Sequence, residues 1–242
     1  MRIKFLRHAA VEIVAESGLR ILTDPHMPGY YHPPGGSLYG EPISESYDIV
    51  VVSHEHPDHN AVTAVPGKHE IVRGMELIGK GITTVKGIDF WSVGTYHDDK
   101  EGALLGNNAI TCFNVDGVKI CHSGDIGHVP TAEQIDELNK YGMDIVLLCI
   151  GLIEKVGERY EKYVIDSGAT TMNGIYEALK PHIKVLIPIH YRYKSCDFRF
   201  ITLGEFIQGK SDVVYHYLSE MNFNEGFWEK PMPQILVLQP AL

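Results

Sequence analysis

Four potential metal ligands lie within six consecutive residues, in the segment His-Glu-His-Pro-Asp-His at positions 54–59. An apolar run at 47–53 comes directly before them and is typical of a buried strand. The ligands therefore leave the end of a rigid strand and enter a turn, where Pro57 fixes the backbone. Side chains at this spacing can serve two adjacent metal ions, and imidazole with carboxylate suits zinc, iron, manganese or nickel. A surface loop that is merely rich in histidine is the less favoured interpretation.

Three further candidate ligands stand where the loops after strands are expected, namely His97, Asp125 and His190. Each lies at or just beyond the end of an apolar run. A lone histidine in such a position is more often a hydrogen-bonded structural residue than a ligand. The three together, in this order behind the 54–59 turn, predict a metal site built from the ends of several strands.

With these residues in this order, the chain resembles the metallo-β-lactamase superfamily. The pattern of that family is H-x-H-x-D-H, followed by a His, an Asp and a second His, each at the end of a strand. It is met here by His54, His56, Asp58, His59, His97, Asp125 and His190. The segment at 19–25 also looks like the family's early strand, which ends in Asp, so the resemblance covers most of the chain. It defines a fold and a site rather than a substrate.

The resemblance implies two divalent metal ions, zinc by default, with manganese, nickel or iron as alternatives. In that family pattern the first ion would be bound by His54, His56 and His97, and the second by Asp58, His59 and His190. Asp125 would bridge the two ions. A bridging carboxylate holds two cations about 3.5–4 Å apart, and a water between them loses a proton near neutral pH. The resulting hydroxide would be the nucleophile.

Two carboxylates are the candidate catalytic residues in this interpretation. Asp58 is expected to orient the hydroxide, and Asp125 is expected to bridge the ions that hold it. Asp24, at the end of the early strand, is expected to contact the metal ligands rather than the metal ions. It would support the site by a hydrogen bond to a ligand histidine or to the backbone of the motif.

Tyr191, Arg192 and Lys194 are candidate substrate contacts, because they directly follow His190 and would lie near the metals. The positively charged side chains of Arg192 and Lys194 would hold an anionic group of a substrate, although alternating Arg and Lys are more often merely solvated. The loop at 28–40 is rich in Tyr, Pro and Gly. It is interpreted either as a lid over the site or as an ordered surface loop packed by its own tyrosines.

The rest of the chain alternates strands and helices without an internal repeat or a linker, which indicates one domain over residues 1–242. Residues 11–15 and 19–22 predict a hairpin, and Thr131 begins a capping box, which predicts a helix. Further patterns predict a strand, a helix, a strand and an edge strand, at 143–150, 169–179, 184–189 and 234–238. This alternation suits the α/β fold of the family, an αββα sandwich of two mixed β-sheets with helices on the outer faces.

At 242 residues and 44% hydrophobic content, the chain can bury a sizeable core. Cys112, Cys121 and Cys149 lie in apolar runs and are expected to be buried thiols rather than parts of a disulfide framework. The first eight residues lack the apolar core of a signal peptide. No run approaches the roughly 20 apolar residues of a membrane span. These features predict a cytoplasmic protein without a membrane partner.

The net charge of −10 argues against a nucleic-acid partner, since such proteins usually carry a basic field. A small molecule, either neutral or anionic, is the expected substrate. A homo-oligomer is compatible with the composition, because tyrosines suit an interface as well as a pocket.

The predicted function is that of a metal-dependent hydrolase acting on a small ester, lactone or phosphoester. Within the superfamily the chain resembles the branch that includes L-ascorbate-6-phosphate lactonase, on Thr23-Asp24-Pro25, Thr171-Met172 and the segment 187–191. Ala169 stands where that branch often has a His, so its substrate is not carried over. A mononuclear iron-dependent oxygenase of the persulfide dioxygenase type, on the same fold, is the alternative, and a nuclease is less favoured. Iron content and oxygen uptake would separate an oxygenase from a hydrolase.

Overall fold

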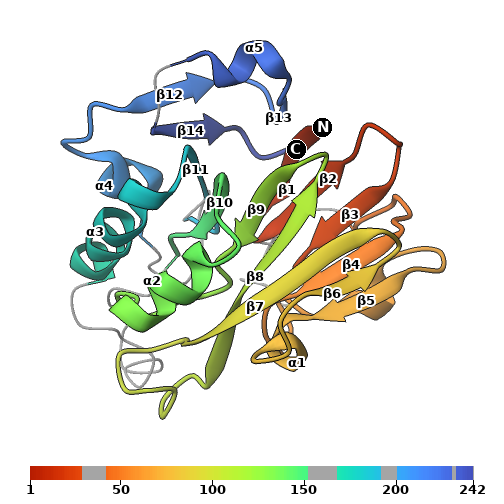
Figure 1. Ribbon diagram of the computed structural model, residues 1–242, viewed down its shortest axis with the longest axis horizontal. Helices are drawn as coiled ribbons and strands as arrows, with labels where there is room; N and C mark the ends of the chain where they lie inside the picture. The colour runs from red at the N-terminus through yellow and green to blue at the C-terminus, as the bar shows by residue number, and fades with distance from the viewer. Residues whose placement is uncertain (29–41, 152–167, 192–200, 231–232, 242) are drawn as a thin grey trace, which may run out of the picture.

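Two facing β-sheets form the centre of the protein (Figure 1). The structure is a computed structural model, and it describes residues 1–28, 42–151, 168–191, 201–230 and 233–241. Within these residues, the first sheet has the spatial order β13 (Glu220–Asn222), β1 (Arg2–Arg7), β2 (Ala10–Val14), β3 (Arg20–Thr23), β4 (Ile49–Val52) and β5 (Glu70–Arg73). The second has the order β12 (Val213–His216), β14 (Gln234–Leu238), β11 (Val185–Ile189), β10 (Ile145–Cys149), β9 (Val118–His122), β8 (Asn107–Val115), β7 (Ile88–Tyr96) and β6 (Thr83–Val85).

Both sheets are mixed. In the first, β1, β2 and β3 pair antiparallel, whereas β3, β4 and β5 pair parallel. In the second, the neighbours β6, β7, β8 and β9 pair antiparallel. The neighbours β9, β10, β11, β14 and β12 pair parallel. The helices of the described residues are α1 (Gly74–Leu77), α2 (Ala132–Asn139), α3 (Gly168–Leu179), α4 (Leu203–Ile207) and α5 (Glu225–Trp228), with the 3-10 helices η1 (Val62–Ala64) and η3 (Lys180–His182).

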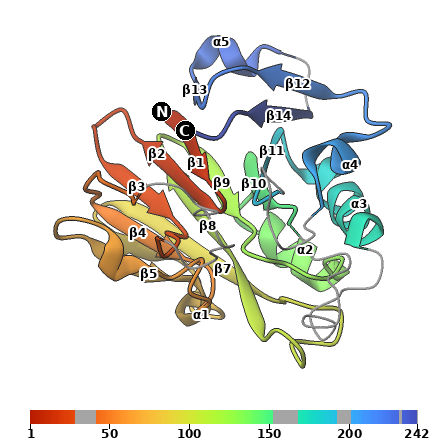
Figure 2. The ribbon, with the colours of Figure 1, turned by 180° about the vertical axis from the view of Figure 1, so that it is seen from behind.

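The apolar run of β10 supplies two cores at once. Side chains alternate between the faces of a strand, so Ile145 and Leu147 pack in the core between the sheets. Val146 and Leu148 pack on the other face, in the core that includes residues of α2, α3 and α4. These three helices lie together beyond the second sheet (Figures 1 and 2). Burial on both faces explains why the run is apolar throughout.

The outer face of the first sheet has its own smaller core. Leu22 of β3 and Val50 of β4 pack there with Tyr47, Val62 and Val65, so η1 and the segments beside it cover this face. The two sheets with their outer layers confirm the predicted αββα sandwich. This arrangement brings the carboxyl ends of β3 and β4 opposite those of β9 and β11.

Most of the predicted elements are confirmed, but one placement is wrong. The hairpin is β2–β3, and Thr131 forms the capping box of α2. The run at 234–238 was predicted to be an edge strand, whereas β14 lies inside the second sheet between β12 and β11. All five of its residues are buried. A run apolar on both faces is typical of such an inner strand.

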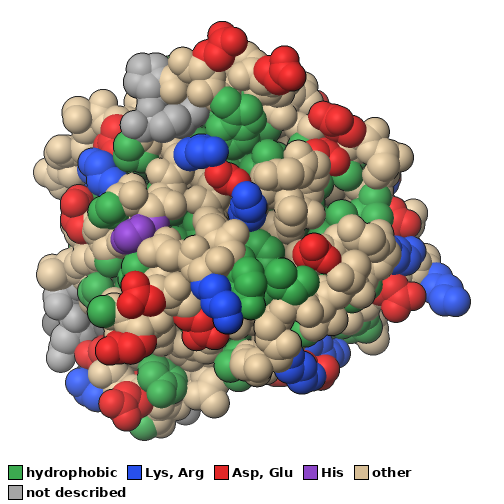
Figure 3. Space-filling model, viewed as in Figure 1, with side chains coloured by type: hydrophobic (Ala, Val, Ile, Leu, Met, Phe, Trp, Pro, Cys, Tyr) green, Lys and Arg blue, Asp and Glu red, His purple; other side chains and the backbone are tan. Residues whose placement is uncertain are grey.

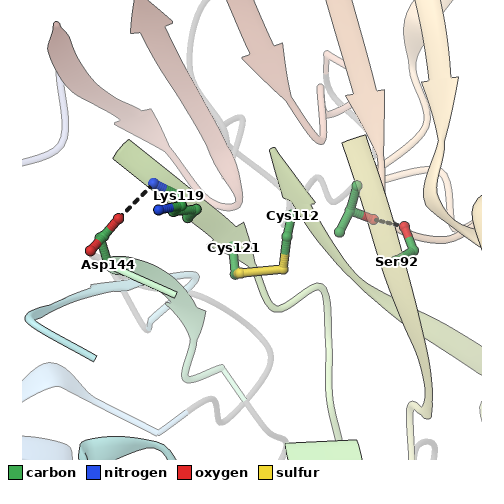
Figure 4. Close-up of a disulfide and its surroundings, with 6 residues drawn as sticks. Ser92, Cys112, Lys119, Cys121 and Asp144 are labelled. Carbon is green, nitrogen blue, oxygen red and sulfur yellow. Dashed lines mark hydrogen bonds between the residues drawn. A yellow bond between two sulfur atoms is a disulfide. The ribbon is translucent and has the colours of Figure 1, made fainter. Parts of the chain in front are cut away.

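The expectation of separate buried thiols is wrong for Cys112 and Cys121, which form a disulfide between β8 and β9 (Figure 4). The two strands are joined by Asp116 and Gly117, both with positive φ, as a two-residue hairpin turn requires. The register set by that turn places Cys112 directly opposite Cys121, with 4.0 Å between their Cα atoms. Cys149 is a free, buried thiol.

Removing this disulfide should destabilise the protein. Because the bridge closes a loop of nine residues, the variant with Cys112→Ala and Cys121→Ala should lose about 3 kcal/mol of unfolding free energy. For a chain of this size, this lowers the melting temperature by on the order of 5–10 °C. Thermal unfolding of both proteins measures the shift. Fragment masses after digestion without reductant check the linkage, and unlinked fragments would contradict it.

The surface shows no single-signed field on the face drawn in Figure 3, where acidic and basic side chains are interspersed. Among the described helices, none is both long and apolar enough to cross a bilayer.

Candidate metal centre

The seven predicted ligands come together at the carboxyl ends of strands from both sheets. The turn after β4 carries four of them, and it is closed by the backbone amides of His59 and Asn60, which both donate to the carbonyl of His56 at 2.9 and 3.0 Å. Of the remaining three, His97 follows β7, Asp125 follows β9 and His190 follows β11. The long-range packing of the sheets therefore assembles what the chain holds in four separate segments.

His54, His56 and His97 form a first cluster, in which the nitrogens that could bind a metal all lie within 4.8 Å of one another. His54 Nε2 is 3.1 Å from His56 Nδ1. The ring of His97 lies 5.0 Å from that of His54 and 4.9 Å from that of His56, centroid to centroid. His54 is buried, whereas His56 and His97 are half-buried, so the cluster is reached from the side of the latter two.

His8, Asp58, His59 and His190 form a second cluster on the same criterion of 4.8 Å. All four are buried. His59 Nε2 lies 3.6 Å from Asp58 Oδ2, and the rings of His59 and His190 stack with 5.3 Å between their centroids. Three of these residues were predicted as ligands of one ion, and His8 was not predicted to take part.

Asp125 stands between the two clusters. Its Oδ2 lies 3.3 Å from His97 Nε2 in the first cluster, and 3.2 Å from His59 Nε2 and 3.5 Å from His190 Nε2 in the second. Its backbone is held by Asn108, whose Oδ1 accepts from the Asp125 amide at 3.0 Å. A single carboxylate oxygen thus faces imidazole nitrogens of both clusters.

Asp24, which directly follows β3, is connected to both clusters, to His59 directly and to His54 through Ser53. Its carboxylate accepts from the backbone amide of Ser53 at 2.7 Å, from the hydroxyl of Ser53 at 2.6 Å and from His59 Nδ1 at 2.8 Å. The Ser53 hydroxyl also lies 2.9 Å from His54 Nδ1. Asp24 was predicted to hydrogen-bond a ligand histidine or the backbone of the motif, and contacts of both kinds are present. Asp24 also forms, with His54 and His59, a group whose possible ligand atoms lie within 4.8 Å of one another, so its role outside the ligand set stays a prediction.

These contacts determine which ring nitrogens of His54 and His59 carry a proton and which are left to face the site. A carboxylate only accepts hydrogen bonds, so His59 Nδ1 donates to Asp24, and in the neutral ring His59 Nε2 carries the lone pair. The Ser53 hydroxyl likewise donates to Asp24, so it accepts from His54 Nδ1, and His54 Nε2 also carries a lone pair. In neutral His59 this lone pair faces the carboxylates of Asp58 and Asp125, an arrangement that is favourable only with a cation among them: a proton on Nε2, in line with the raised pKa of His59, or a metal ion in its place. The donor set therefore fits a metal ion.

The charges of the site agree with this. Burial would raise the pKa of the Asp125 carboxyl, but His190 and His59 hold it well below its ordinary value. Burial lowers the pKa of His54 and of His190. For His59, burial would lower the pKa, but Asp125 and Asp58 raise it well above its ordinary value. Ionised carboxylates thus create a demand for positive charge beside imidazoles that are mostly neutral, the form that binds metals.

Comparison with known families agrees with this geometry. The family described as the beta-lactamase superfamily domain matches residues 2–190. The chain belongs to the beta-lactamase superfamily. The matched region begins in β1 and ends at His190, so it contains every predicted ligand of the superfamily motif.

Two relatives within the superfamily carry the name "UPF0173 metal-dependent hydrolase". The protein of Thermococcus onnurineus is 29% identical over 211 residues, which cover 79% of this chain and 84% of the relative. That of Methanobrevibacter smithii is 30% identical over 220 residues, with 79% and 82% covered. A solved structure from Thermotoga maritima, described as a "putative zn-dependent hydrolase of the metallo-beta-lactamase superfamily", is 26% identical. It has a TM-score of 0.68 and covers 98% of this chain and 97% of its own.

Gly151 is required by the second cluster because it leaves room for His190. A Cβ atom at position 151 would lie 2.0 Å from both Nδ1 and the carbonyl oxygen of His190. Gly151→Ala should therefore displace His190, weaken metal binding and destabilise the fold by about 1–3 kcal/mol. Metal content and melting temperature measure both effects. Gly226→Ala is the matched control, since its Cβ would meet nothing nearer than 3.8 Å; equal behaviour of the two variants would contradict the prediction.

Sequence reasoning missed His8, although a signal for it existed. Like the predicted ligands, it directly follows a strand, β1. Its φ of +53° is in the left-handed region, as are those of Asp24 (+36°) and His190 (+55°). Non-glycine residues in this region are uncommon and gather at functional sites.

The predicted substrate contacts are placed only in part. The Tyr191 ring packs 5.8 Å from that of Phe5, and its hydroxyl donates to the carbonyl of Leu238 at 3.4 Å. Arg192 and Lys194 lie outside the described residues, as does almost all of the 28–40 loop. A role for these residues in substrate binding stays a prediction.

Proposed function

We propose that this superfamily member is a hydrolase that depends on two divalent metal ions and acts on a small ester, lactone or phosphoester. The observation that best supports this is the Asp125 carboxylate, whose Oδ2 lies 3.3 Å from His97 of one cluster and 3.2 Å from His59 of the other. A carboxylate between two sets of imidazole nitrogens is suited to hold two cations side by side. The names of the relatives support metal-dependent hydrolysis as the class of reaction.

In this proposal the first cluster binds one ion, and the second ion is bound by Asp58, His59 and His190, with Asp125 shared. Zinc is the default, with manganese, nickel or iron as alternatives. When bound, two such ions lower the pKa of a water between them and polarise the bond to be attacked.

The protein groups contribute orientation and charge. Asp24 keeps the lone pairs of His54 and His59 directed into the site, through the hydrogen bonds described above. Asp58, whose pKa is lowered by His59 and His8 against the effect of burial, remains ionised and is the proposed group that orients the attacking water. The half-buried His56 and His97 mark the side from which substrate approaches, while the buried second cluster excludes solvent.

The test combines metal analysis with a substrate panel. Metal content of the purified protein is measured by plasma mass spectrometry, and turnover is followed on a nitrophenyl ester, a lactone and a phosphodiester. About two divalent ions per chain with turnover of one substrate class would support the proposal and identify that class. One iron per chain, oxygen uptake with a persulfide and no hydrolysis would replace it by the mononuclear oxygenase.

A further inference from the structure

We propose that His8 is a positioning residue of the second metal site: it holds the Asp58 carboxylate by a hydrogen bond and braces His190, without itself binding the metal. The inference rests on the proposed two-ion site and adds to it a residue for which the H-x-H-x-D-H motif has no position. Fifty residues separate His8 from Asp58 along the chain, so only the packing of the fold brings them together.

The backbone of His8 is fixed from both sheets. Its carbonyl oxygen accepts from the amide of His190 at 2.7 Å, which ties the β1–β2 turn to the end of β11. The next carbonyl, that of Ala9, accepts from His122 Nε2 at 3.0 Å and from the hydroxyl of Thr23 at 3.2 Å. With these anchors the left-handed φ of +53° is held in place. Such a conformation in a non-glycine residue persists only where its surroundings over-determine it.

The side chain points into the second cluster. His8 Nε2 lies 3.1 Å from Asp58 Oδ2, and both side chains are buried, with 3% and 10% of their surface exposed. The ring of His8 lies 3.8 Å from that of His190 and 5.3 Å from that of His59, centroid to centroid. His8 therefore contacts three of the residues proposed for the second ion.

The place of the proton on His8 distinguishes positioning from direct ligation. In a hydrogen bond with the Asp58 carboxylate, which only accepts, His8 Nε2 is the donor, and a ring nitrogen that carries the proton cannot bind a metal; if both residues bound the same ion, Nε2 would instead carry a lone pair. The nitrogen of His8 that faces the cluster is thus engaged with Asp58. An imidazole that donates to a ligand carboxylate fixes the rotamer of that ligand, as residues around metal sites commonly do.

Three variants test the inference. Asparagine tolerates the left-handed backbone but is too short to reach Asp58, whereas the side-chain amide of glutamine extends about as far as histidine Nε2 and can donate in its place. His8→Asn should weaken binding of the second ion by roughly 10–100-fold, and His8→Gln should restore most of that loss. His182→Asn, at a histidine whose Nδ1 contacts Asn139 away from the site, controls for the loss of one histidine.

The measurements are titration calorimetry with Zn²⁺ on metal-free protein, circular dichroism to verify folding, and visible spectra after saturation with Co²⁺. Weak binding by His8→Asn, rescue by His8→Gln and an unchanged Co²⁺ spectrum in both would support positioning. Loss of the second ion in both variants, or a Co²⁺ spectrum altered at saturation, would show that His8 is a ligand and overturn the inference. Wild-type affinity in His8→Asn would overturn it as well.

The two proposals fail in different ways. If the wild-type protein binds one ion only, the two-ion function fails whatever the His8 variants do. If the wild-type protein binds two and His8→Asn binds both equally well, only the role of His8 is lost.

Discussion

Asp125→Ala is expected to reduce the bound metal from two ions towards one per chain and to abolish hydrolysis. The reason is that one oxygen, Asp125 Oδ2, faces His97, His59 and His190 at 3.2–3.5 Å. Without that carboxylate, two cations would stand close together with no anion between them. A loss of metal-ion catalysis of this kind removes several kcal/mol of transition-state stabilisation, which corresponds to a fall in rate of at least about 1,000-fold.

The measurement is metal content by plasma mass spectrometry together with turnover of the substrate found for the wild-type protein. Asp136→Ala is the matched control, because Asp136 is an exposed residue of α2 away from the clusters. The folded state of both variants is checked by circular dichroism. Two ions per chain and wild-type turnover in Asp125→Ala would refute the bridging role.

Asp24→Asn is expected to weaken the binding of both ions, by roughly 10–100-fold each. Asparagine has nearly the same shape and tolerates the left-handed φ of +36° at this position. Its amide, however, has only one acceptor oxygen, so it cannot accept both from the Ser53 amide, which donates to one Asp24 oxygen, and from the Ser53 hydroxyl and His59 Nδ1, which donate to the other. If the amide nitrogen donates to His59 Nδ1 instead, the proton of His59 moves to Nε2, and the lone pair that faces Asp58 and Asp125 is lost.

Ser53→Ala separates the two arms of this network. It removes the hydroxyl that links Asp24 to His54 and leaves the Asp24–His59 hydrogen bond in place. We therefore expect Ser53→Ala to weaken only the ion at the first cluster, whereas Asp24→Asn weakens both. Calorimetric titration with Zn²⁺ reports the two steps. Wild-type affinity for both ions in Asp24→Asn would show that Asp24 does not control the ring tautomers.

Local features of the chain predicted much of the fold. Runs such as the one in β10 are apolar at every position because both faces of the strand are covered, and they are recognisable without knowing what covers them. The β2–β3 hairpin and the capping box of Thr131 depend on neighbours a few residues away. Even the disulfide is local in origin, since the Asp116-Gly117 turn fixes the register that pairs Cys112 with Cys121. That register could have been worked out in advance.

Other features depend on contacts between distant segments. An apolar run indicates a buried strand but not its neighbours, so β14 was predicted at an edge although β12 pairs with it. Gly151 is needed only because His190 approaches it from another strand. Neither fact is encoded in the periodicity around these residues, because each is a property of how sheets and loops pack.

The sequence by itself determined the set of candidate ligands, their positions at strand ends and the family to which they point, since motif spacing and strand patterning are short-range properties. The tertiary structure alone decided how the segments meet: that Asp125 stands between two histidine clusters, that Asp24 serves both, and that His8 reaches Asp58. The physical reason is the order of strands in the two sheets. Strand order is set by the burial of both apolar faces, and it alone brings side chains from β1, β4, β9 and β11 within hydrogen-bonding distance of one another.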